Sequence, residues 1–186
     1  WIVGSLKPLL ETGMPLPPIS EDVPAGAGAG PSAPAADITA DWHRSQAIEI
    51  NNAVWDQLAA VGAGTATTVG LVRGAYAAAY HCERATGATP ANEARARYLI
   101  GKAWLASGRP DQALGYGDRT LAQCTEHGLV DFDLAYAHEL RARSLAGLGR
   151  DAEAREAWAS ALAVEIADPE DREIVDADFA DAPATA

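Results

Sequence analysis

Residues 100–122 read IGKAWLASGRPDQALGYGDRTLA, and residues 141–163 read RARSLAGLGRDAEAREAWASALA. When Gly108 is set against Gly149, further positions with small or apolar side chains coincide: Gly101 with Ala142, Ala113 with Ala154, and Leu121 with Leu162. Glycine ends helices readily, so each stretch is predicted to be two helices joined by a tight turn, which makes them antiparallel. The repeated pattern therefore predicts stacked helical hairpins.

The chain outside this repeat carries the same helical signals from Asp37 onward. Apolar residues recur at spacings of three and four over residues 47–61, which indicates a long helix that ends at Gly62. A second helix is predicted over about residues 67–85. Further helices are predicted to begin where a capping residue or a first-turn proline stands: Thr89-Pro90, Pro110, Asp131, Asp151 and Asp168. No segment reads as a strand, so the predicted fold class is all-α.

Composition and charge exclude several classes of function. The 186 residues are 48% hydrophobic and 22% charged, which is typical of a globular domain. A net charge of −12 argues against a nucleic-acid partner, because phosphate binding needs a surplus of lysine and arginine. No apolar run approaches the roughly 18 residues of a membrane span, so no membrane partner is predicted. Cys82 and Cys124 lack metal-ligand spacing and are too few for a disulfide framework, which favours a cytoplasmic location.

Residues 1–38 are predicted to form an N-terminal arm ahead of a helical domain at residues 39–182. The prolines of PLPPISEDVP (15–24) favour extended backbone, and AGAGAGPSAPAAD (25–37) has the composition of a linker. The apolar opening WIVGSLKPLLETG (1–13) does not read as a signal peptide. It is interpreted either as an addition ahead of a natural start at Met14 or as a tethered peptide ligand. Such a ligand would lie in a groove of its own chain or of a neighbour, the second case giving a homo-oligomer through the arm.

The hairpin pattern resembles the tetratricopeptide repeat, in which a small residue, a glycine seven positions on and an alanine five further recur at helix contacts. The likeness is most specific over residues 92–163. The phrases DFDLAYAHE and IADPEDREIVDADFA are similar to those of uncharacterised actinobacterial tetratricopeptide proteins. The resemblance implies a short solenoid of three hairpins, closed by a C-terminal capping helix at residues 168–180.

In this family the first helix of each hairpin lines a concave groove. The resemblance implies the following groove residues: Arg95, Tyr98, Lys102 and Leu105 in one repeat, and Tyr136, Glu139, Arg143 and Ala146 in the next. Asn51 and Asn52 are predicted to extend the groove by pairing with peptide backbone. The cations and tyrosines favour a peptide or protein partner with acidic or C-terminal carboxylate groups. The alternative is a set of solvated helix faces with i,i+4 pairs, of which Glu139–Arg143 is one.

Replacing the three cations of this groove by alanine is expected to weaken partner binding and to leave the fold intact.

The histidines offer a competing interpretation as metal ligands, but they lie on four different predicted helices and lack Glu-x-x-His pairs: His43, His81, His127 and His138. The four tryptophans of the predicted helical domain are predicted to be core residues: Trp42, Trp55, Trp104 and Trp158. No catalytic residue, metal ligand or cofactor is therefore predicted.

The sequence thus predicts a non-catalytic module or scaffold that binds a protein or peptide. Two alternatives stay open. One is a small metal-dependent enzyme built on the helical bundle, and the other is a regulatory subunit of a larger assembly.

Overall fold

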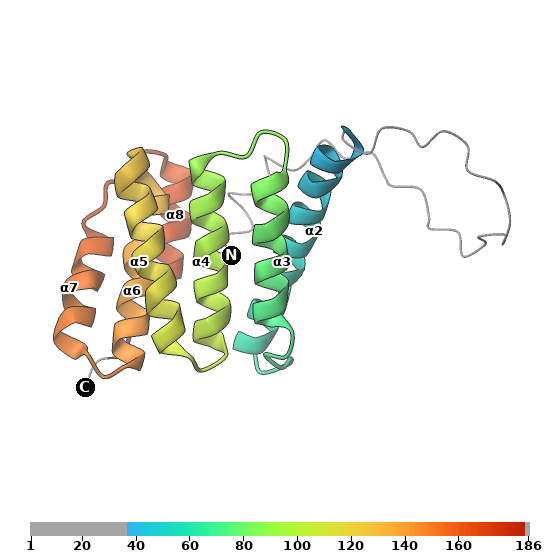
Figure 1. Ribbon diagram of the computed structural model, residues 1–186. Helices are drawn as coiled ribbons and strands as arrows, with labels where there is room; N and C mark the ends of the chain where they lie inside the picture. Colours follow the sequence, from blue (N-terminus) through green and yellow to red (C-terminus); the bar gives the residue numbers. More distant parts are fainter. Residues whose placement is uncertain (1–36, 185–186) are drawn as a thin grey trace, which may run out of the picture.

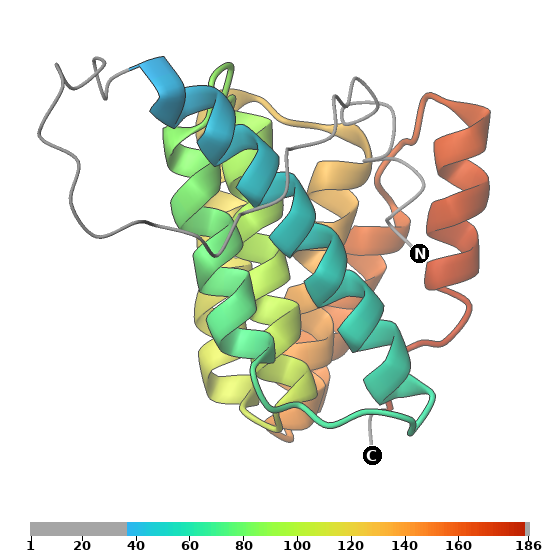
Figure 2. The ribbon, with the colours of Figure 1, turned by 90° about the vertical axis from the view of Figure 1, so that its right-hand side faces the viewer.

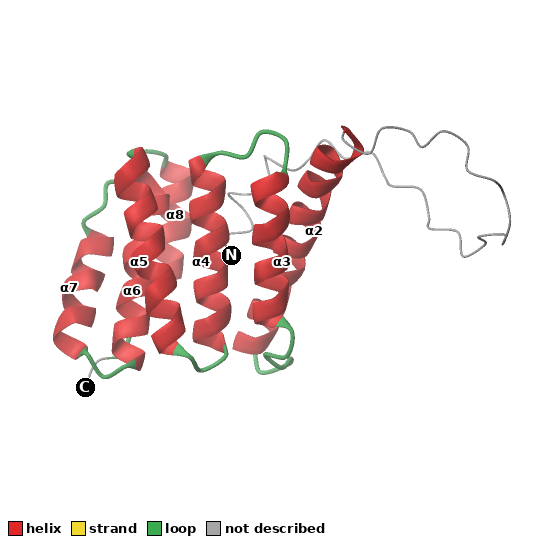
Figure 3. Cartoon of the chain, viewed as in Figure 1, coloured by secondary structure: helices red, strands yellow, loops and turns green. Residues whose placement is uncertain are grey.

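A computed structural model describes residues 37–184, and every regular element in that range is an α-helix (Figures 1 and 3). In chain order the helices are α2 (Asp37–Gly62), α3 (Leu71–Arg84), α4 (Pro90–Ala106), α5 (Pro110–His127), α6 (Asp131–Gly147), α7 (Asp151–Leu162) and α8 (Pro169–Asp178). The all-α fold class is thereby confirmed. The predictions for residues 1–36, including the tethered opening peptide, lie outside the described residues.

Neighbouring helices pack against each other along the chain, α2 on α3, α3 on α4, α4 on α5, α5 on α6 and α6 on α7. A second set of contacts joins α2 to α4, α4 to α6, and α6 to α8. Figure 1 shows α2 at one end of the stack and α7 at the other, and Figure 2 shows α8 on the side away from α3. The order agrees with stacked hairpins, and the tetratricopeptide-like arrangement stays a prediction.

Local capping chemistry explains where the helices begin. The Thr89 side chain accepts from the Asn92 backbone N–H and the Asn92 side chain accepts from the Thr89 backbone N–H, so a capping box opens α4. The Asp168 side chain accepts from the Glu170 backbone N–H at the start of α8. Helix α3 begins at Leu71 rather than near residue 67, because Gly70 takes a left-handed conformation (φ 90°) directly before it.

Two glycines set the distance between helices in the middle of the stack. A Cβ at Gly101 of α4 would collide with the buried side chain of Leu140 on α6. A Cβ at Gly117 of α5 would lie 3.2 Å from the backbone nitrogen of Arg141 on α6. The small residues of the repeat therefore permit contacts between successive hairpins as well as within one hairpin.

The main core lies between the hairpins and is built on fully buried leucines, Leu71, Leu99 and Leu140 among them. Trp55 is buried, and Trp104 and Trp158 pack at the edge of the core. The prediction for Trp42 was wrong: the residue is 45% exposed, and its ring lies edge-on against His43 of α2 and His81 of α3. Within residues 37–184, no helix combines the length and apolar character needed to cross a bilayer.

Candidate functional site

The residues predicted for the concave groove lie mainly on α4 and α6, where their rings and charges meet each other. Tyr98 stacks on Trp55 of α2 with ring centroids 6.1 Å apart, and it contacts Tyr136 of α6 at 5.5 Å. Tyr136 in turn meets Phe179 edge-on at 5.4 Å. Both tyrosines are buried. They therefore form part of a ladder of rings that joins successive hairpins.

The three predicted cations are each bound to a carboxylate of the same chain. Arg95 makes a two-pronged bond to Asp133, with Nε–Oδ1 and Nη2–Oδ2 distances of 2.8 and 2.9 Å. Lys102 Nζ lies 3.0 Å from Glu139 Oε1, and Arg143 donates to the same carboxylate. The basic surface expected from the sequence is consequently neutralised from within.

Glu139 is the centre of this concave network, which we define as Arg95, Tyr98, Lys102, Asp133, Tyr136, Glu139, Arg143 and Asp178. Its side chain is only 3% exposed, and the Tyr98 hydroxyl donates to it at 3.0 Å. Burial alone would raise the pKa of Glu139, but Lys102 and Arg143 outweigh burial and lower it. Burial, assisted by Glu139, raises the pKa of Tyr98 well above its usual value, so its proton stays in place as a donor.

The far end of the network is closed by the chain's own acidic segment. The Tyr136 hydroxyl donates to Asp178 Oδ2 at 2.6 Å. Arg143 Nη2 donates to the backbone carbonyl of Asp181 at 2.8 Å, just after the end of α8. A cation at the carbonyl end of a helix complements its dipole. An acidic segment thus occupies the place where the sequence analysis expected an acidic partner, but it comes from the same chain.

The remaining predicted residues stand apart from this network. Leu105 packs at the edge of the core. Asn51 and Asn52 lie on α2, where the Asn51 amide donates to the Asn52 side-chain oxygen at 3.3 Å. Whether any of the predicted groove residues contacts a partner stays a prediction.

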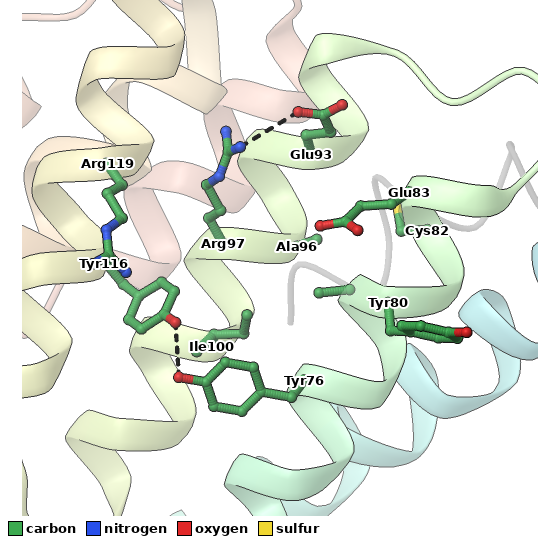
Figure 4. Close-up of a pocket in the computed structure, with 11 residues that line it drawn as sticks. Tyr76, Tyr80, Cys82, Glu83, Glu93, Ala96, Arg97, Ile100, Tyr116 and Arg119 are labelled. Carbon is green, nitrogen blue, oxygen red and sulfur yellow. Dashed lines mark hydrogen bonds and ion pairs between the residues drawn. The ribbon is translucent and has the colours of Figure 1, made fainter.

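A pocket of about 340 Å³ lies on the other side of α4, between α3 and α5 (Figure 4). We call it the tyrosine pocket and define it by its three tyrosines, Tyr76, Tyr80 and Tyr116. The apolar part of its lining comes from Ala79, Ala96 and Ile100. Its volume falls in the lower part of the roughly 300–1,000 Å³ range of ligand sites. The pocket therefore suits a short anchoring segment better than a folded domain.

Aromatic surface is unusually open at this pocket. Tyr76 is 42% exposed and Tyr80 is 50% exposed. Tyr76 reaches from α3 to Tyr116 on α5, with the two hydroxyl oxygens 2.7 Å apart (Figure 4). The indole N–H of Trp104 donates to the Tyr76 hydroxyl at 3.4 Å. Flat rings with polar tips at the surface are typical of binding sites.

The two tyrosine hydroxyls leave one proton for an outside acceptor. Only one of the two protons is used in the Tyr76–Tyr116 hydrogen bond, whichever oxygen donates. The Tyr76 oxygen also accepts from Trp104. The Arg119 guanidinium lies 4.9 Å from the Tyr116 ring centroid, and it forms no ion pair with a carboxylate in the described part of the chain. This end of the pocket is therefore rich in donors.

The opposite end of the pocket carries carboxylates that already have partners. Glu93 pairs with Arg97 at 3.4 Å, and Arg97 also donates to Gln123. Glu83 points from α3 toward α4 (Figure 4) and pairs with Arg84 at 3.3 Å. The pocket thus has a hydroxyl and guanidinium end and a carboxylate end.

Cys82 lines the pocket beside Glu83 (Figure 4), but it is not activated as a nucleophile. Burial, followed by the charges of Glu93 and Glu83, raises the pKa of its thiol. A thiolate is the reactive form of cysteine, so a raised pKa favours an inert thiol at neutral pH.

Two of the four histidines meet next to the pocket. The Nδ1 atoms of His43 on α2 and His81 on α3 are 2.7 Å apart, and the rings of Trp42 and Tyr80 border the pair. Burial, then His43 and Arg84, lower the pKa of His81. Over residues 37–184, no group of three or more His, Cys, Asp or Glu side chains is placed to hold a metal ion.

Sequence reasoning missed the tyrosine pocket, although one signal for it was present. Tyr76 and Tyr80 stand four positions apart in an alanine-rich helix, although the Tyr76 ring meets Tyr116 of α5 and the Tyr80 ring meets His43 of α2. The contact with Tyr116 joins residues 40 positions apart and depends on how two hairpins stack.

Comparisons with models of known protein families, with curated proteins and with solved structures found no match.

Proposed function

We propose that the chain is a non-catalytic binding module that holds an extended segment of a protein or peptide in the tyrosine pocket. The observation that carries this proposal is the open, donor-rich hollow between α3, α4 and α5, where Tyr76 is 42% exposed and its hydroxyl meets that of Tyr116. The stack would act as a tetratricopeptide-like scaffold, working in the cytoplasm with no cofactor.

The residue types around the pocket support binding. Tyrosine, tryptophan and arginine are the side chains that most often carry the energy of protein interfaces, and Tyr76, Trp104 and Arg119 gather at one end of this pocket. The apolar floor of Ala79, Ala96 and Ile100 supplies contact area without a polar group that needs a partner. An occupant would therefore bury apolar side chains on the floor and offer acceptors to the rim.

The state of the concave network supports placing the site in the pocket. A partner at the network would have to break the ion pairs of Arg95 with Asp133 and of Lys102 with Glu139. Removing one member of a buried ion pair costs about 3–5 kcal/mol. A partner at the tyrosine pocket meets side chains that already face solvent.

The experiment is selection of peptides of about 12 residues from a displayed library on the full chain. We expect selected peptides to lose affinity roughly tenfold or more when Tyr76 and Tyr80 are both replaced by alanine. The matched control is Leu162→Ala, because Leu162 is a large exposed apolar residue on α7, away from the pocket. Equal affinity for the native chain and for the double tyrosine variant would contradict the proposal.

A further inference from the structure

We propose that the occupant of the tyrosine pocket is the chain's own segment Pro15–Pro18, of sequence PLPP, held in cis by the linker that follows it. This inference rests on the proposed function and adds the identity of the bound segment. The segment lies outside the described residues, so its placement is argued from the pocket, the sequence and the reach of the linker.

The chemistry of the pocket fits a proline-rich segment. Proline has no backbone N–H, so such a segment offers carbonyl acceptors and few donors. The Tyr76–Tyr116 pair keeps one proton for an acceptor, and Arg119 adds a guanidinium without a carboxylate partner in residues 37–184. Proline-rich helices with three residues per turn make no internal hydrogen bonds, and they dock in aromatic-lined grooves.

The shape of the lining fits the same segment. Tyr76 and Tyr116 offer rings at one end of the pocket (Figure 4), and Ala79 and Ala96 are small lining residues on α3 and α4. Pyrrolidine rings are compact and apolar, and Leu16 adds one larger apolar side chain. A rigid extended segment also loses little conformational entropy when it binds, so a small pocket is sufficient.

The attachment point of the arm lies near the pocket. The Ala40 carbonyl on the first turn of α2 accepts from the Thr86 N–H, in the turn between α3 and α4. His43 contacts His81, whose neighbours Tyr80 and Cys82 line the pocket. The start of α2 at Asp37 is about 9 Å along the helix axis from His43.

The linker between Pro18 and Asp37 spans this distance with ease. Residues 19–36 are rich in glycine and alanine, and a flexible chain of about 18 residues has a root-mean-square reach of roughly 23 Å. A tether of this kind presents its segment at an effective concentration on the order of millimolar. Even a segment with millimolar affinity would therefore occupy the pocket for a large part of the time.

The test compares full chains that differ only in prolines of the arm. One variant carries Pro15→Ala, Pro17→Ala and Pro18→Ala, and the matched control carries Pro31→Ala and Pro34→Ala in the linker. Amide NMR spectra report on Ala79, Ala96 and Ile100 in the pocket. We expect the triple variant to shift these three resonances and the control to leave them in place. Unchanged pocket resonances in the triple variant would overturn the inference.

A second arm of the experiment adds the synthetic peptide MPLPPIS, residues 14–20. We expect it to bind the triple variant with a dissociation constant of about a millimolar and the native chain about twofold more weakly, because the native arm competes. Equal affinity for the two chains, or a solution mass that doubles with concentration and reverts in the triple variant, would overturn the cis assignment. If MPLPPIS fails while a library-selected peptide still shifts the pocket amides, this inference falls and the proposed function stands.

Discussion

Helix α4 separates two polar regions that differ in how their charged and aromatic side chains are paired. On one face, Arg95 and Lys102 are sealed against carboxylates of α6. On the other face, Ala96 and Ile100 form the floor of the tyrosine pocket, where aromatic and guanidinium groups still face solvent. The difference teaches that a set of cations and tyrosines on a helical stack is not in itself a binding site. What matters is which of them keep an unused hydrogen-bonding capacity after the helices have packed.

The largest effect is expected from Glu139→Ala, which removes the centre of the concave network. The change leaves Lys102, Arg143 and the Tyr98 hydroxyl without their shared acceptor in a buried place. Unfolding in urea should show a loss of about 3–5 kcal/mol. The matched control on the pocket side is Glu83→Ala, an exposed residue whose loss should change stability by less than about 0.5 kcal/mol.

The same reasoning revises one expectation from the sequence. Alanine at Arg95, Lys102 and Arg143 was expected to spare the fold, but these cations are the counterions of Asp133 and Glu139. Their joint loss would leave two carboxylates poorly exposed to water and without a cation. We now expect the triple variant to be less stable than the native chain, and an unchanged urea midpoint would contradict the network.

The next effect concerns the spacing of helices that underlies both faces of α4. Gly101→Leu should destabilise the fold by at least about 1–3 kcal/mol, because its side chain would displace Leu140 in a fully packed core. Gly115→Ala is the matched control, since a Cβ there meets no atom within 4 Å and alanine favours a helix over glycine by up to about 1 kcal/mol. Thermal melts measure both variants. If the melting temperatures of Gly101→Leu and Gly115→Ala both lie above, or both lie below, that of the native chain, the result would argue against this packing.

Acidification should lower the stability of the fold through the concave network, because Glu139 has a lowered pKa. The unfolded chain protonates Glu139 near its ordinary pKa of 4.5, whereas the folded chain protonates it only at lower pH. In that interval the unfolded state binds more protons, so the free energy of unfolding falls as pH falls below about 4.5. Urea titrations at several pH values give the free energy of unfolding of the native chain and of Glu139→Gln. A plot of this free energy against pH should have a smaller slope for the variant. Parallel slopes would mean that Glu139 has no lowered pKa in the folded chain.

The smallest effect is expected from Tyr76→Phe, which deletes one hydroxyl of the tyrosine pocket and keeps the ring. The Trp104 N–H and Tyr116 lose a partner at an exposed site, so stability should change by less than about 1 kcal/mol. Affinity for a selected peptide should fall by roughly two- to tenfold, as for the loss of one hydrogen bond. Isothermal titration of the two proteins measures this, and an unchanged affinity would remove the hydroxyl pair from the site.

Local chemistry let the sequence predict the helices and their starts. Thr89 and Asp168 cap helices with their side chains, and caps act within one turn, which a linear sequence displays directly. Asp131 is the first residue of α6, but no side chain caps that helix. The resemblance to the tetratricopeptide repeat put Tyr98 and Glu139 on one surface, and in the structure they share a hydrogen bond although 41 positions separate them.

The pairing of charges could not be predicted, because it depends on how one hairpin sits on the next. Asp133 lies 38 positions from Arg95, and Asp178 lies 42 positions from Tyr136. Nothing in the local sequence indicates that these particular carboxylates turn inward. The tyrosine pocket was missed for the same reason, since its walls come from three helices, α3, α4 and α5.

One measurement tests the central claim most directly: titration of the isotope-labelled full chain with a library-selected peptide, followed by amide NMR. The two faces of α4 give separate reporters in one helix. We predict that shifts concentrate at Ala96 and Ile100, and at Ala79 on α3, while Arg95 and Lys102 stay in place. Shifts centred instead on Arg95, Lys102 and Arg143 would contradict the account and return the binding site to the concave network.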